Sequence, residues 1–183
     1  GPPRTDVGKK ATKAVRASAG IPCVLYGSKE VIHFQTTESE LRHLVFTGDF
    51  KVAELDIEGK KVRSILKAIQ FHPVKDNIVH VDFLELVAGQ AVKLEIPLKP
   101  RGSSPGVKLG GKLIQSVRKV KVKTTPEKMV DELFVDISGL ELGQSLRIKD
   151  IIAVDGIDIQ QNASIPVVSI EIPRALRSAA AKE

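Results

Sequence analysis

The sequence predicts a mainly β protein with a few short helices, organised as two domains. Short runs in which apolar and polar residues alternate recur along most of the 183 residues. Turn-forming glycines and prolines, 14 and 10 in number, separate these runs. Hydrophobic residues make up 42% of the chain and charged residues 27%, which is enough to bury a core and excludes wholesale disorder.

The first half is predicted to begin with a helix and to continue as strands that a second helix interrupts. Helix formers fill residues 11–18, and Gly20 followed by Pro22 ends this helix. The polar residues 36–40 are a capping sequence for a second helix over 41–46. Strands are expected over 23–27, 31–35, 52–57, 62–69 and 78–86.

The second half has almost no helical periodicity, and its many short strands indicate an antiparallel sandwich or barrel. Its strands are expected around 92–98, 113–122, 133–137, 146–148 and 167–172. A boundary is expected at 88–90, because a new set of strands begins there and the charge balance changes. We therefore predict a first domain over 4–88, a second over 89–173 and a flexible Ala-rich tail over 174–183.

The net charge of +6 is distributed unevenly along the chain. Residues 1–29 hold six basic residues against one acidic residue, and residues 89–128 hold ten against two. The segments 30–88 and 129–172 carry net charges of −3 and −6. Concentrated basic surface attracts polyanions whatever the total charge, so the pattern favours a nucleic-acid partner. A patchy solvated surface is the alternative that charge alone leaves open.

Groups that would support catalysis are few. Cys23 lies between apolar residues of a predicted strand, which favours a buried, inert thiol. His72 and His80 lie eight residues apart without a recognisable metal-binding motif. The glycines match neither a P-loop nor a dinucleotide fingerprint. We therefore expect no enzymatic activity, no metal or other cofactor and no small-molecule substrate.

Targeting signals are also not expected. No run of about 18 apolar residues is present, so the sequence predicts no transmembrane helix and no membrane partner. A single cysteine forms no internal disulfide, which fits a reducing cytosolic compartment. The start, Gly1-Pro2-Pro3, has neither an initiator Met nor a signal-peptide pattern, and it is interpreted as a processing scar or a truncated beginning.

Polar and basic residues of the first half form a candidate binding surface. Lys9, Lys13 and Arg16 share one helix face through their i, i+4, i+7 spacing. The polar candidates are Tyr26, Gln70, His72, His80 and Asp82. Tyrosine stacks on bases, glutamine pairs with base edges, and a His–Asp pair hydrogen-bonds phosphate or hydroxyl groups. Such a face beside a basic helix fits an RNA minor groove, and an ordinary solvated sheet face is the open alternative.

Four ordered motifs resemble the bacterial large-subunit ribosomal protein twenty-five family. These motifs are residues 7–11 with Arg16, then 20–27, 69–75 and 78–83. Residues 100–113 and 135–140 look like the second domain of its longer, two-domain branch, called the CTC or general-stress type. The resemblance implies a six-stranded β-barrel that binds 5S ribosomal RNA, followed by a mostly β domain at the ribosome periphery.

The resemblance also implies roles for individual residues. Arg4, Lys9, Lys13 and Arg16 match basic positions that meet phosphates and grooves. The positions on the RNA-facing sheet are matched by Tyr26, Gln70, His72, His80 and Asp82. Ala14 stands where some single-domain relatives have a basic residue, and the first strand that the family places before Arg4 is absent.

We therefore expect a non-enzymatic, cytoplasmic, ribosome-associated component of the large ribosomal subunit. Its expected partners are 5S ribosomal RNA, the subunit and neighbouring ribosomal proteins. One alternative is a stress-induced protein-interaction module whose acidic segment 129–172 docks a basic partner. A hydrolase or metalloenzyme that uses His72 or His80 is the other alternative.

Overall fold

The computed structural model describes residues 1–28 and 30–173, and strands dominate it, which confirms the mainly β prediction. The chain divides into two compact units, Gly1–Val92 and Lys93–Glu183. The predicted tail, 174–183, lies outside the described residues.

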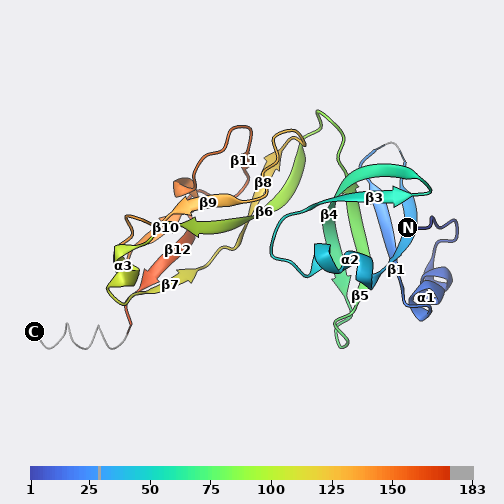
Figure 1. Ribbon diagram of the computed structural model, residues 1–183, viewed down its shortest axis with the longest axis horizontal. Helices are drawn as coiled ribbons and strands as arrows, with labels where there is room; N and C mark the ends of the chain where they lie inside the picture. Colours follow the sequence, from blue (N-terminus) through green and yellow to red (C-terminus); the bar gives the residue numbers. More distant parts are fainter. Residues whose placement is uncertain (29, 174–183) are drawn as a thin grey trace, which may run out of the picture. The chain divides into compact units, whose positions relative to one another are not determined.

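The first unit is a curled sheet of five strands in the order β2-β1-β5-β4-β3 (Figure 1). The strands are β1 (Gly20–Tyr26), β2 (Ile32–Thr37), β3 (Val52–Ile57), β4 (Lys60–Phe71) and β5 (Ile78–Glu85). Neighbouring strands are antiparallel except β1 and β5, which run parallel. Helix α1 (Lys9–Ala17) precedes β1, and α2 (Glu38–Val45) connects β2 to β3.

Strand alternation decides which side chains of this unit are buried. Cys23 of β1 lies opposite Phe34 of β2 and Val81 of β5, and all three are almost completely buried. The rings of Phe34 and Phe83 pack with their centroids 5.8 Å apart. Because successive side chains of a strand point to opposite faces, the residues between these core positions lie on the outer face of the sheet.

The sixth strand of the predicted barrel is reduced to a bridge formed by residues 1–4. Pro3 pairs with Phe34, and the carbonyl of Pro2 accepts a hydrogen bond from the N–H of Gln35 at 3.1 Å. On the other side, the ammonium of Gly1 donates to the carbonyl of Asp56 in β3 at 2.5 Å. Residues 1–4 therefore contact both edge strands of the sheet. Two consecutive prolines lack N–H donors, so this segment does not form a regular ladder.

The second unit contains two sheets, of order β10-β12-β7 and β11-β8-β6-β9. Its strands are β6 (Val92–Arg101), β7 (Lys112–Gln115), β8 (Lys119–Thr124), β9 (Leu133–Asp136), β10 (Ser145–Arg147), β11 (Asp158–Ile159) and β12 (Pro166–Glu171). Two short helices accompany them, α3 (Pro105–Lys108) and the 3-10 helix η1 (Ile148–Asp150).

One strand pair departs from the antiparallel arrangement predicted for this unit. Strands β6 and β9 run parallel, with Leu98 opposite Leu133 and Arg101 opposite Asp136. Parallel neighbours require a long crossover connection, and the segment between these strands contains α3, β7 and β8. The core of the unit comes from alternate residues of its strands, such as Ile96, Val120 and Val135, each 0% exposed.

Candidate nucleic-acid interface

The strand register brings four of the predicted site residues onto the outer face of the first sheet. Gln70 of β4 lies opposite His80 of β5, and Val24 of β1 lies opposite Asp82. Tyr26 follows Val24 by two residues, so it points to the same side of the sheet. We call Tyr26, Gln70, His80 and Asp82 the polar face. Each of the four side chains is at least partly exposed.

A close contact between His80 and Asp82 orients two groups of the polar face. Nδ1 of His80 lies 2.8 Å from Oδ1 of Asp82, and the two side chains are 23% and 31% exposed. In this arrangement Nδ1–H donates to the carboxylate, and Nε2 points elsewhere as an acceptor in the neutral ring or a donor in the charged ring. The pair therefore presents a fixed polar edge to a ligand.

Tyr26 stays a hydrogen-bond donor over a wide pH range. Burial, and secondarily the negative charge of Asp82, raise the pKa of its phenol above the usual value of 10.0. The protonated hydroxyl is able to donate to a phosphate or ribose oxygen, while the ring offers a stacking surface.

Helix α1 lies on the surface of the first unit. None of its residues is buried, and Lys9, Lys13 and Arg16 are all exposed. Arg16 donates its Nε–H to the carbonyl of Val79 in β5 at 3.1 Å. Because Val79 directly precedes His80, this hydrogen bond holds the basic helix next to the polar face.

Arg4 and His72 form hydrogen bonds within the protein that the sequence did not predict. Arg4 donates its Nη2–H to the carbonyl of Asp6 at 3.1 Å, and its backbone N–H pairs with β2. Nδ1 of His72 accepts the N–H groups of Val74 and Lys75, each at 3.2 Å. The imidazole of His72 thus organises the turn between β4 and β5, which leaves Nε2 as its remaining polar atom.

His33 belongs to the same outer face and was missed by the sequence analysis. It lies on β2 opposite Val24, which in turn lies opposite Asp82. Its side chain is half-buried. The alternation of residues 31–35 contained the signal, because Phe34 is buried and its neighbour His33 therefore faces outward.

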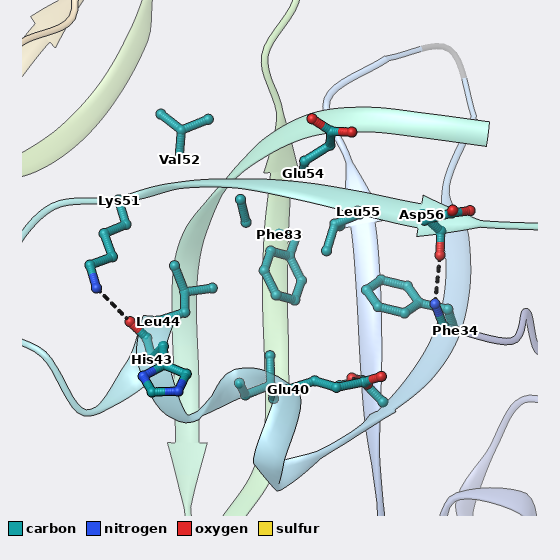
Figure 2. Close-up of a pocket in the computed structure, with 14 residues that line it drawn as sticks. Phe34, Glu40, His43, Leu44, Lys51, Val52, Glu54, Leu55, Asp56 and Phe83 are labelled. Carbon is teal, nitrogen blue, oxygen red and sulfur yellow. Dashed lines mark hydrogen bonds between the residues drawn. The ribbon is translucent and has the colours of Figure 1, made fainter. Parts of the chain in front are cut away.

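The first unit also contains a hollow that none of the polar-face residues line. A cavity of about 460 Å³ is bordered by α2 and β3, and Phe34, Leu55 and Phe83 are among its lining residues (Figure 2). Lys51 at its rim donates to the carbonyl of His43 at 2.9 Å. None of the nine predicted site residues lines this cavity, so its mainly apolar walls offer no chemistry to the candidate interface.

Groups for metal binding or nucleophilic catalysis do not converge in the part of the chain that the structure describes. Within residues 1–28 and 30–173, no three His, Cys, Asp or Glu side chains are grouped as metal ligands. Burial raises the pKa of the Cys23 thiol to about 12. The helices within those ranges are all too short or too polar to cross a membrane.

Comparison with known proteins finds a family match for each half of the chain. Residues 1–83 match the Ribosomal L25p family, and residues 91–174 match the C-terminal domain of ribosomal protein TL5. Large ribosomal subunit protein bL25 of Bacteroides thetaiotaomicron is 42% identical over 97% of this chain and 90% of its own length.

Relatives from other genera are similar over nearly the whole chain as well. The bL25 protein of Cytophaga hutchinsonii is 40% identical over 98% of this chain and 95% of its own length. That of Porphyromonas gingivalis is 38% identical over the whole chain and 96% of its own length. The similarity therefore spans both units, and the chain belongs to the two-domain branch of the bL25 family of large ribosomal subunit proteins.

Proposed function

We propose that this protein is a structural component of the large ribosomal subunit, and that its first unit binds 5S ribosomal RNA. The observation that carries the proposal is that Arg16 of the basic helix α1 is hydrogen-bonded to β5 directly beside His80. The names of the relatives support the assignment to the large ribosomal subunit, and the family resemblance supports the binding of 5S RNA. As a ribosomal component the protein acts in the cytoplasm.

The basic residues supply affinity in this proposal. Arg4, Lys9, Lys13 and Arg16 would neutralise phosphates of the RNA backbone. Each such contact releases condensed counterions, so about four contacts predict a log–log salt slope of roughly −3 to −4. Basic helix contacts of this kind position the protein but carry little sequence information.

The polar face supplies recognition. The ring of Tyr26 would stack on a base or sugar, and the amide of Gln70 would pair with a base edge. The fixed His80–Asp82 pair would hydrogen-bond a 2′-hydroxyl or a base edge in the wide minor groove of RNA. His72 would contribute only through Nε2, because its Nδ1 accepts two backbone N–H groups.

We infer a non-enzymatic role from the same residues. The raised pKa of Cys23, about 12, leaves almost no nucleophilic thiolate near neutral pH. His80 is paired with Asp82 on the outer face of the sheet, where the two side chains are 23% and 31% exposed.

The test is a titration of the full chain against 5S RNA and a scrambled hairpin of equal length. Specific recognition predicts that 5S RNA binds more tightly than the scrambled hairpin. Equal affinities for the two RNAs would show that the protein binds RNA only through its positive charge. The variant Lys9→Gln/Lys13→Gln/Arg16→Gln should weaken 5S binding at least tenfold. A matched control removes three exposed charges from α2 and the β3–β4 hairpin: Arg42→Gln/Lys60→Gln/Lys61→Gln.

Co-sedimentation with the large subunit separates this proposal from a protein-interaction module. The α1 triple variant should lose subunit association together with 5S binding. Undiminished association of that variant would instead favour docking through the acidic segment 129–172.

A further inference from the structure

Basic residues gather on two neighbouring strands of the second unit. The segments 92–101 and 118–124, which contain β6 and β8, hold seven basic residues and one acidic residue, Glu95. The two strands are adjacent in the four-stranded sheet, and the N–H of Leu98 donates to the carbonyl of Arg118 at 2.9 Å. The concentration of positive charge in the sequence is therefore also a concentration on two adjacent strands.

Strand β8 arranges three of these charges in a row. Lys119, Lys121 and Lys123 are exposed, whereas Val120 and Val122 between them are 0% exposed. The three lysines therefore share the outer face, at intervals of about 6.6–6.8 Å along the strand. We call them the lysine row.

Nearby acidic groups neutralise the lysine row only in part. Glu95 lies 4.0 Å from the ammonium of Lys121, and both side chains are more than half exposed, so this pair is weak. Asp158 of β11 lies opposite Lys123 in the register. Lys99, by contrast, is paired with Glu132 beside the other edge strand. The uncompensated charge thus remains on β8.

The chemistry of the lysine row favours a nucleic-acid backbone over a protein. Protein interfaces are depleted in lysine and centred on buried aromatic or apolar anchors. The exposed side chains of β8 are all lysines, and Phe134, an exposed aromatic of this sheet, lies on β9 beyond β6. Evenly spaced ammonium groups suit a chain of phosphates, which they bind as point charges without reading sequence.

We propose that the lysine row is a second RNA-binding surface, which contacts the phosphate backbone of RNA without sequence preference. This surface goes beyond the 5S site proposed for the first unit. That it meets ribosomal RNA in the cell rests on the proposed function, but its RNA affinity does not.

The test uses the full chain with two probes, an RNA duplex of unrelated sequence and 5S RNA. The variant Lys119→Gln/Lys121→Gln/Lys123→Gln should weaken duplex binding at least fivefold. Its log–log salt slope should become shallower by about 2 to 3, since each of the three lost contacts removes roughly 0.7–0.9. Its affinity for 5S RNA should change less than twofold, whereas the α1 triple variant should lose 5S binding.

Two further variants distinguish an effect of the lysine row on RNA binding from the effects of lower total charge and of misfolding. Lys108→Gln/Lys112→Gln/Lys149→Gln removes three exposed charges from other parts of the same unit and should retain duplex binding. Lys119→Arg/Lys121→Arg/Lys123→Arg keeps the charges and should bind as the parent does. Equal losses in the two Gln variants, or no loss in the β8 variant, would overturn the proposal whatever the 5S result.

Discussion

Arg16 in α1 donates its Nε–H to the main-chain carbonyl of Val79 in β5 over 3.1 Å. The two residues are 63 positions apart in the chain. No residue of α1 is fully buried, and this hydrogen bond links the helix directly to β5. A planar guanidinium is able to donate to the sheet through Nε and to a phosphate through its Nη groups at once.

The substitution Arg16→Lys should therefore weaken 5S RNA binding about fivefold to tenfold, although it keeps the charge. A lysine ammonium lacks the fork geometry that serves both partners together. The salt slope should stay unchanged, because the number of neutralised phosphates is the same. Dissociation constants measured across a salt series give both quantities.

The matched control for this prediction is Lys13→Arg. Lys13 lies on the exposed face of the same helix, and a larger cation there should bind phosphate equally well. Its 5S affinity should stay within about twofold of the parent. An Arg16→Lys variant that binds as tightly as Lys13→Arg would assign Arg16 a purely electrostatic role.

Gly27 permits the close packing of β1 against β5 beside Tyr26. Its φ is +118°, and an added Cβ would lie 2.8 Å from Cδ1 of Leu84 and 3.1 Å from the carbonyl oxygen of Glu85. Gly27→Ala should lower the free energy of unfolding by about 1–3 kcal/mol. It should also weaken RNA binding by displacing Tyr26. Urea unfolding and the 5S titration measure the two effects.

Gly48→Ala is the control for that substitution. Nothing lies within 4 Å of a Cβ added at Gly48, and the residue does not have a left-handed φ. Its stability should change by no more than about 0.5 kcal/mol. A Gly27→Ala protein as stable as the Gly48→Ala protein would contradict the packing argument.

Local periodicity was sufficient to predict most of the strands, among them the strand that carries His80 and Asp82. The alternation of β5 is regular from His80 to Leu84, with Val81 and Phe83 each 0% exposed, so the outward direction of His80 and Asp82 follows directly. The capping sequence likewise indicated α2, whose Glu40 accepts the backbone N–H of Thr37 at 3.2 Å. These features depend on residues close together in the chain.

Features that depend on distant pairing did not follow from the sequence. The register shifts between Leu66 and Ala68 in β4, and this bulge directs Gln70 outward. Strict alternation from Val62 through Leu66 would have directed Gln70 into the core. The parallel pairing of β6 with β9 and the Arg16–Val79 contact are similarly long-range, and no local pattern encodes them.

Cys23 should be unreactive in the folded protein. Its pKa is raised to about 12 chiefly by burial, so the thiolate that attacks disulfide reagents is scarce at pH 8. The reagent dithiobisnitrobenzoate should react at the rate of unfolding, and promptly in denaturant. Fast stoichiometric reaction in native buffer would show that the thiol is accessible.

The raised pKa of the Cys23 thiol also predicts that the folded protein loses stability at alkaline pH. A folded-state pKa above the unfolded value of about 9.0 means that the native state holds the proton more tightly. This contribution to stability is complete below pH 9 and is lost as the pH rises toward 12. Cys23→Ala should show a flatter stability profile in that window, measured by urea unfolding.

Glu40 should contribute a pH-dependent stabilisation at the acidic end. The hydroxyl of Thr36 and the backbone N–H of Thr37 donate to its carboxylate, and these hydrogen bonds lower its pKa below the usual 4.5. A lowered pKa in the folded state means that the contribution is complete above about pH 4.5 and is lost as the pH falls through the folded value.

The substitution Glu40→Gln should remove this dependence while keeping an acceptor at the helix start. We expect the variant to be less stable than the parent at pH 7, because the neutral amide loses the charge-assisted bonds and the interaction with the helix dipole. The difference should shrink as the pH falls below 4.5, where the carboxylate of the parent is protonated as well. Thermal unfolding of both proteins between pH 3 and 7 measures the difference. A constant difference across that range would show that Glu40 acts through shape alone and that its charge does not stabilise α2.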